Sequence, residues 1–119
     1  DDREMRRLLV ATLRKENCEV IEAKNGAQLW ELLIDKSSDG LLIDGIDLVI
    51  SDVRMPGKTG LEVLSGLRRT DGDTPVILIT AFGDTDTHAE AYRLGALAVF
   101  NKPFDLDDLR TIVVSLKRL

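Results

Sequence analysis

Acidic side chains stand at two points of the chain where predicted strands would end. Asp52 closely follows the apolar segment Leu48–Ile50, and Asp1 and Asp2 immediately precede the first predicted helix. Ligands of open α/β sheets bind at the carboxyl ends of the strands. Acids that converge there repel one another unless a hard cation such as Mg²⁺ joins them through oxygen ligands. These residues therefore predict a magnesium site.

A hydroxyl group and an amine follow the next two predicted strands. Thr80 comes after Val76–Ile79, and Lys102 comes after Ala98–Asn101. An acid cluster with Mg²⁺, a hydroxyl and a lysine suits phosphoryl transfer, in which a carboxylate can be the nucleophile. The cation would neutralise the repulsion between Asp52 and an anionic phosphoryl donor. The chemistry indicated is thus transfer of a phosphoryl group to an aspartate.

The elements that must position these residues alternate between helix and strand, which predicts a parallel sheet with helices on both faces. Helices are predicted at residues 5–13, 29–33, 61–67, 85–94 and 105–116, the last with Asp105 as its N-cap. Strands are predicted at residues 18–23, 48–50, 76–79 and 98–101. The segment Asp39–Ile46 is expected to be a surface connection or a contact for a partner.

Composition narrows the function classes. The net charge of -5 argues against direct nucleic-acid binding and against an electrostatic membrane anchor. No apolar run approaches the roughly 20 residues of a spanning helix, and no signal peptide opens the chain. Cys18 is the single cysteine, which excludes an internal disulfide and favours a cytoplasmic location. We interpret Cys18 as a small apolar residue at a strand start.

Five short motifs resemble the receiver domain family of two-component response regulators. The motifs are Asp1-Asp2, residues 51–57, Thr80-Ala81, Gly95-Ala96 and residues 101–104. They occur in the order and with the spacing of the family, and the resemblance covers essentially the whole chain. The resemblance implies that Asp52 is the phosphoacceptor and that Asp2 binds Mg²⁺ directly. It also implies that Asp1 binds Mg²⁺ largely through water and that the backbone carbonyl of Arg54 is a further metal ligand.

The same resemblance implies that Lys102, Thr80 and the backbone N–H of Ala81 bind the phosphoryl oxygens. It further implies a flavodoxin-like fold, with five parallel strands in the order 2-1-3-4-5 and helices on both faces. Residues 1–119 would form one receiver domain without its first, central strand, because the chain enters a helix directly after Asp1-Asp2. We expect an apolar strand before Asp1, or an equivalent strand from another chain.

The implied function is a phosphorylation switch rather than an enzyme with an external substrate. A sensor histidine kinase would donate the phosphoryl group, and the domain would catalyse only its own phosphotransfer and autodephosphorylation. The output surface, and a possible homodimer contact, would span the Thr85–Leu116 face, with the output domain covalently linked or separate. The alternative within this fold is a degenerate receiver that only binds partners, but none of the five expected site residues is lost.

Other interpretations are weaker. The segment Gly57-Lys58-Thr59 is not a P-loop, because that motif needs glycine where Asp52 stands. A haloacid-dehalogenase-type phosphatase is a poor alternative, because Arg54 replaces its second acid. His88 and Glu62 are expected on solvated faces, and two aromatic residues, Trp30 and Tyr92, in helix packing.

One position departs from the family. Val99 stands three residues before Lys102, where the family often has a switching aromatic residue. We therefore expect activation through Thr80 and its loop without an aromatic rotamer change, and we expect Phe100 to be buried in both states.

Overall fold

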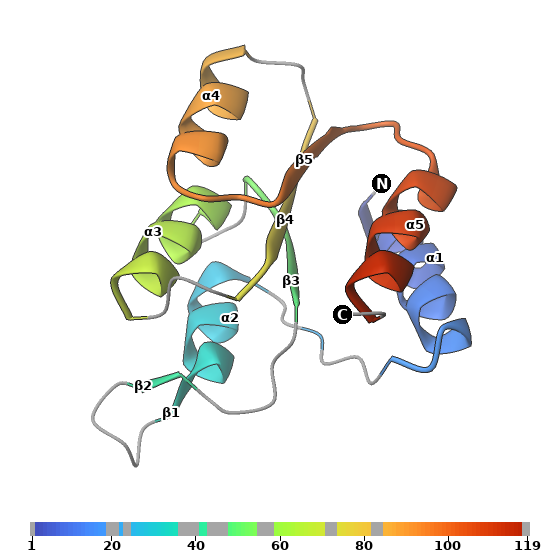
Figure 1. Ribbon diagram of the computed structural model, residues 1–119, viewed down its shortest axis with the longest axis horizontal. Helices are drawn as coiled ribbons and strands as arrows, with labels where there is room; N and C mark the ends of the chain where they lie inside the picture. Colours follow the sequence, from blue (N-terminus) through green and yellow to red (C-terminus); the bar gives the residue numbers. More distant parts are fainter. Residues whose placement is uncertain are drawn as a thin grey trace. The chain divides into compact units, whose positions relative to one another are not determined.

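The computed structural model describes residues 2–18, 22, 25–35, 41–42, 48–54, 59–70, 74–81 and 85–117. The chain divides into two compact units (Figure 1). The first, here the sheet unit, is Ala23–Lys102. The second, here the helical unit, combines two segments far apart in the sequence, Asp1–Glu22 and Pro103–Leu119.

The sheet unit is built on a parallel sheet, which confirms the predicted α/β class. Its described strands, in spatial order, are β3 (Val49–Asp52), β4 (Val76–Thr80) and β5 (Ala98–Asn101). Their register pairs Asp52 with Ile79 and Thr80 with Asn101, so the carboxyl ends of the three strands are level. Every residue of β4 is buried, as expected for a strand covered on both faces.

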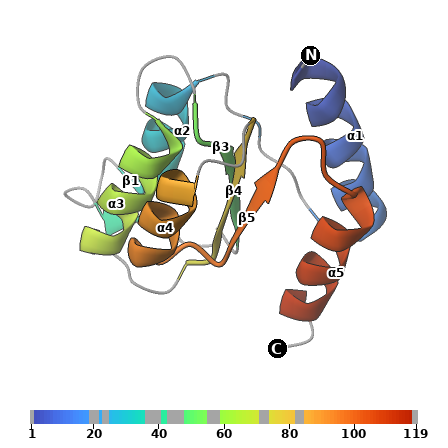
Figure 2. The same cartoon turned by 90° about the horizontal axis from the view of Figure 1, so that it is seen from above.

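Three helices of this unit lie on the same side of the sheet (Figure 2). They are α2 (Gly26–Leu33), α3 (Gly60–Thr70) and α4 (Thr85–Arg93). The helix predicted at residues 61–67 was marked in the sequence by Leu61, Leu64 and Leu67, and of these Leu64 and Leu67 are fully buried in the core cluster. Trp30 of α2 packs on Gly66 of α3, where an added Cβ would lie 2.6 Å from the indole ring. Packing is thus the role of Trp30, as predicted.

Side chains close the first turns of two helices. The side-chain oxygen of Asn25 accepts a hydrogen bond from Gln28 N at 2.8 Å and caps α2. At the start of α3, Glu62 N donates to the Thr59 hydroxyl at 3.1 Å, and Thr59 N donates to the Glu62 carboxylate at 3.0 Å. This reciprocal capping box gives Glu62 a structural role beyond the solvated face that the sequence predicted.

Two helices end on a residue with left-handed backbone. Asn17 (φ 63°) follows α1, and Gly95 (φ 97°) follows α4. After α4, the N–H groups of Gly95 and Ala96 donate to the carbonyls of Tyr92 and Ala91, each at 3.0 Å. This Schellman arrangement explains the Gly95-Ala96 motif, because glycine adopts positive φ without strain.

The helical unit consists of α1 (Asp2–Lys15) and α5 (Leu106–Lys117), which contact each other. Leu109 and Val113 of α5 are buried, as is Val10 of α1. The helix predicted at residues 5–13 had been expected to place Met5, Leu8, Leu9, Thr12 and Leu13 on its apolar face; Leu8 is instead 50% exposed, and the buried residue is Val10. The predicted N-cap is confirmed: Asp107 N donates to the Asp105 side chain at 2.9 Å.

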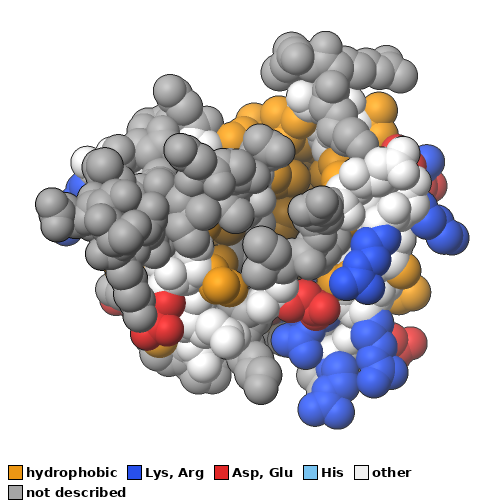
Figure 3. All heavy atoms as spheres, turned by 90° about the horizontal axis from the view of Figure 1, so that it is seen from below, with side chains coloured by type: hydrophobic (Ala, Val, Ile, Leu, Met, Phe, Trp, Pro, Cys, Tyr) orange, Lys and Arg blue, Asp and Glu red, His pale blue; other side chains and the backbone are white. Residues whose placement is uncertain are grey.

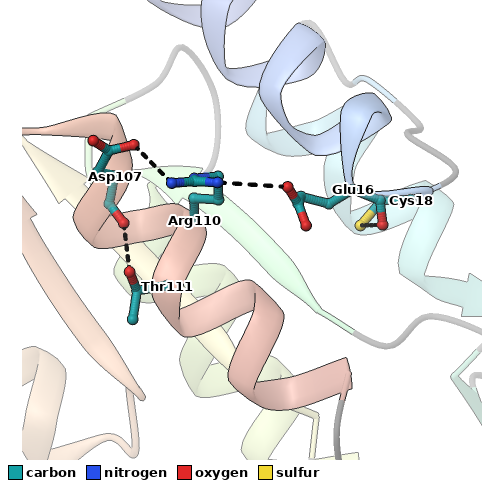
Figure 4. Close-up of polar contacts among 5 residues, drawn as sticks. All are labelled: Glu16, Cys18, Asp107, Arg110 and Thr111. Atoms are coloured by element: carbon teal, nitrogen blue, oxygen red, sulfur yellow. Dashed lines mark hydrogen bonds and ion pairs between the residues drawn. The ribbon is translucent and has the colours of Figure 1, made fainter.

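Charged residues extend the contact between the two helices. Arg110 lies 3.2 Å from the Asp107 carboxylate and 3.8 Å from that of Glu16 at the end of α1 (Figure 4). Several Lys and Arg side chains gather together in the space-filling view (Figure 3). The exposed basic residues of α1 are Arg3, Arg6, Arg7, Arg14 and Lys15.

A short strand pair involves the predicted connection Asp39–Ile46. β1 (Ile34–Asp35) pairs antiparallel with β2 (Leu41–Leu42), which falls within that connection, and the rest of the connection lies outside the described residues. The predicted strand Cys18–Ala23 is not seen at Cys18 or Glu22, and its other residues lie outside the described part. The five-strand order and the strand before Asp1 therefore stay predictions.

None of the helices in the described ranges has the length and hydropathy of a transmembrane segment.

Candidate functional site

The carboxyl ends of the three strands place Asp52, Thr80 and Lys102 at one edge of the sheet. Asp52 and Thr80 are the last residues of β3 and β4, and Lys102 directly follows β5. Lys102 N donates to the Thr80 carbonyl at 2.8 Å, and the Lys102 ammonium lies 3.0 Å from the Asp52 carboxylate. The predicted grouping of acid, hydroxyl and amine is therefore present.

The ion pair between Asp52 and Lys102 is partly shielded from water. Their side chains are 32% and 19% exposed, and Thr80 is 9% exposed. Partial burial strengthens the attraction compared with a pair in bulk water. The remaining exposure of Asp52 leaves its carboxylate accessible to a reactant, and the neighbouring ammonium would offset the negative charge of an incoming anion.

The backbone at Asp52 is held on several sides. Val53 N donates to the Ile79 carbonyl at 2.8 Å, and the Ser51 hydroxyl donates to the Asp52 carbonyl at 2.9 Å. Gly60, the first residue of α3, lies so close that an added Cβ would be 2.3 Å from the Asp52 carbonyl oxygen. The sequence analysis gave no role to Gly60. A glycine at the start of a helix, soon after the nucleophile position, was the available signal.

The other predicted site residues are only partly placed. Arg54 and Ala81, which closely follow β3 and β4, are both exposed. Asp1 and the side chain of Asp2 lie outside the described residues, so the predicted metal set is not tested. Among the described residues, no three His, Cys, Asp or Glu side chains form a group able to hold a metal ion.

Two residues of α4 contact β5 in a way that the sequence did not predict. His88 Nε2 lies 2.8 Å from Asn101 Oδ1, and Val99 N donates to the Tyr92 hydroxyl at 3.3 Å. His88 was expected on a solvated face; its side chain is half-buried, and its hydrogen bond to the exposed Asn101 is itself exposed. Tyr92 was expected in helix packing but is 52% exposed.

Val99, which stands where the family often has an aromatic residue, and its neighbour Phe100 are both half-buried. Val99 packs against the core cluster of the sheet unit. Phe100 is only half-buried, so the expectation that it is buried in both states is wrong for this structure.

The family model for the response regulator receiver domain matches residues 1–114. The chain belongs to the response regulator receiver domain family. Sporulation initiation phosphotransferase F of Bacillus subtilis is 35% identical over 92% of this chain and 82% of its own length. The transcriptional regulatory protein CpxR of Escherichia coli is 40% identical over 88% of the chain, but over only 41% of its own length.

Solved receiver domains have the same fold. The non-phosphorylated HemR receiver domain from Leptospira biflexa has a TM-score of 0.83 at 23% identity, covering 100% of this chain and 90% of its own. A response regulator from Burkholderia multivorans has a TM-score of 0.71 at 32% identity, covering 98% of this chain and 89% of its own. The chain spans less than a quarter of the length of the Escherichia coli regulators NtrC and AtoC.

Receiver domains are phosphorylation-switched signalling domains of two-component response regulators, not metabolic enzymes, and in general they bind Mg²⁺ at the phosphorylation site. The family match leaves no basis for the dehalogenase-type phosphatase alternative.

Proposed function

We propose that Asp52 of this receiver domain accepts a phosphoryl group from the phosphohistidine of a sensor histidine kinase, and that the output surface then changes. The observation that carries the proposal is the ion pair of 3.0 Å between Lys102 and Asp52 at the level ends of the parallel strands. It supports the proposal because it combines an accessible carboxylate nucleophile with a cation able to bind the transferred group.

The proposed reaction forms one bond and breaks one. A carboxylate oxygen of Asp52 attacks phosphorus while the P–N bond of the phosphohistidine breaks, and its electron pair remains on the imidazole nitrogen. The Lys102 ammonium then pairs with a phosphoryl oxygen, and the Thr80 hydroxyl and Ala81 N–H bind the others. Hydrolysis of the resulting acyl phosphate, as autodephosphorylation, is the only further reaction that we propose.

We propose Mg²⁺ as the cofactor, held by the carboxylates of Asp2 and Asp52 and the backbone carbonyl of Arg54, with Asp1 acting through water. All four residues offer oxygen donors, the ligand type that Mg²⁺ takes in proteins. The Asp52 side chain is 32% exposed, which suits an ion that keeps part of its water shell. Bound Mg²⁺ would neutralise charge on the reacting oxygens.

The proposed downstream partner is an output domain, either on the same chain or separate. The relatives named as transcriptional regulators are much longer than this chain, which supports an output module in such proteins. We propose the Thr85–Leu116 face as its control surface and as a possible homodimer contact, without direct nucleic-acid or membrane binding. The strand order 2-1-3-4-5 and a cytoplasmic location stay predictions.

Phosphorylation with a small donor tests the proposal. With phosphoramidate and Mg²⁺, the protein should gain the mass of one phosphoryl group, and hydroxylamine should remove it. Asp52→Asn should lose this labelling, whereas the control Asp108→Asn, an exposed acid of α5, should keep it. Chelation of Mg²⁺ should suppress labelling. Undiminished labelling of Asp52→Asn would refute the assignment, and no labelling of the parent protein would favour a degenerate receiver that only binds partners.

A further inference from the structure

Two hydrogen-bond contacts join α4 to β5. The four residues that make them, His88, Tyr92, Val99 and Asn101, are here called the α4–β5 clasp. His88 and Tyr92 are four residues apart and share a face of α4. On β5, the backbone N–H of Val99 and the side chain of Asn101 make the two contacts. The clasp therefore joins one face of α4 to β5 at two points two residues apart, through contacts of 2.8 Å and 3.3 Å.

In the first contact the direction of the hydrogen bond is fixed by chemistry. The Oδ1 atom of Asn101 is a carbonyl oxygen and only accepts, so the Nε2–H group of His88 must donate. This bond reaches the residue that directly precedes Lys102. On the other side of β5, Lys102 N donates to the Thr80 carbonyl at 2.8 Å. Lys102 is thus hydrogen-bonded to β4 through its own backbone N–H, and the preceding Asn101 is hydrogen-bonded to α4 through its side chain.

We propose that His88 and Asn101 are positioning residues for Lys102, which hold its ammonium toward the Asp52 carboxylate. A lysine side chain has large rotational freedom, so its placement depends on how firmly its own backbone is fixed. The inference rests on the proposed function of Lys102, but the position of the ammonium can be measured without any phosphoryl transfer.

Competitive acylation of lysine amines, read by mass spectrometry, measures that position directly. The Lys102 side chain is 19% exposed and its amine is ion-paired, so the amine should react slowly compared with that of the exposed Lys15 as an internal reference. Since one side-chain hydrogen bond changes an equilibrium by a factor of about 2 to 10, His88→Ala and Asn101→Ala should each raise the labelling rate of Lys102 by about that factor.

Matched variants separate positioning from general loosening of α4. His88→Gln restores a donor and Asn101→Asp keeps an acceptor, so both should label Lys102 at nearly the parent rate. The double variant His88→Ala/Asn101→Ala should be no faster than either single variant. Arg93→Ala removes an α4 ion pair that does not reach β5, and it should leave the labelling unchanged.

Unchanged Lys102 labelling in both alanine variants, or effects that multiply in the double variant, would overturn the proposal. The initial rate of phosphoramidate labelling should fall by the same factor in the alanine variants and recover in His88→Gln. If the parent protein is phosphorylated but amine labelling does not respond, the clasp inference fails and the proposed function stands. If the parent is not phosphorylated, the function fails and amine labelling still decides the clasp.

Discussion

At the scale of single residues, Asp52 is already paired before any phosphoryl group arrives. Its carboxylate oxygen lies 3.0 Å from the Lys102 ammonium, which it must share with the transferred group. The proposed switch is therefore an exchange of partners for Lys102, from a carboxylate oxygen to a phosphoryl oxygen. A ligand shifts a conformational equilibrium only through such differential contacts.

Substitution of the lysine tests this exchange. We expect Lys102→Ala to keep Mg²⁺ binding, because the proposed metal ligands are untouched, but to weaken the conformational response to phosphorylation. Amide chemical-shift changes on addition of beryllofluoride and Mg²⁺ would measure the response, with Lys15→Ala as the control. A response of parent size in Lys102→Ala would show that this lysine is not the phosphoryl partner.

Gly60 supports Asp52 through its lack of a side chain. An added Cβ would meet the Asp52 carbonyl oxygen at 2.3 Å, and backbone cannot move aside as a side-chain tip can. Gly60→Ala should therefore destabilise the protein by about 1–3 kcal/mol or more, as overpacking does. Gly66→Ala is the control, since the nearest atoms to its added Cβ would belong to the Trp30 side chain and not to backbone. Urea unfolding should rank Gly60→Ala as the more costly change, and the reverse order would contradict this account.

The sequence predicted the meeting of Asp52, Thr80 and Lys102 because residues that follow parallel strands share one edge of the sheet. It did not predict the bond between His88 and Asn101. A single histidine on a polar helix carries no periodic signal, and its partner depends on how α4 packs beside β5. The placement of Asp1 and Asp2 stays a prediction.

At the scale of elements, α4 carries an exposed ion pair whose contribution depends on pH. Hydrogen bonding by Arg93 lowers the pKa of Glu90 from its ordinary value of 4.5. When the pKa of a carboxyl group is lower in the folded state than in the unfolded state, the group stabilises the folded state at pH values above the unfolded-state pKa. This stabilisation is lost as the pH falls through the folded-state pKa. The stability difference between the parent and Glu90→Gln should therefore shrink on acidification below about pH 4.5. Urea unfolding at neutral and acidic pH measures it, and a constant difference would contradict the expectation.

Element boundaries were predictable where local chemistry marks them. Asp105 was recognised as a cap because it precedes an apolar stripe, and the strand at Val76–Ile79 was recognised because its four residues are all apolar. The capping box of Thr59 and Glu62 was readable from its spacing but was overlooked. The hairpin of β1 and β2 was not predicted, because two-residue strands are too short to produce a period in the sequence.

At the scale of the whole molecule, the buried apolar residues of α5 should contribute more to stability than its ion pairs do. Leu109 is fully buried, whereas the adjacent Arg110 is 48% exposed despite its two carboxylate partners. Leu109→Ala should cost about 2–5 kcal/mol through loss of contacts and a residual cavity. Arg110→Ala should cost no more than about 1 kcal/mol, as for exposed ion pairs. Equal costs in urea unfolding would show that the ion pairs matter more than expected.

The contact between α1 and α5 also determines how long α1 must wait for its partner helix during translation. Glu16 and Arg110 touch across 94 residues of sequence (110 minus 16). At about 5–20 residues per second, a ribosome needs roughly 5–19 seconds to reach the second partner after making the first. Throughout that interval α1 has been made, but α5, the helix that it contacts in the folded protein, has not.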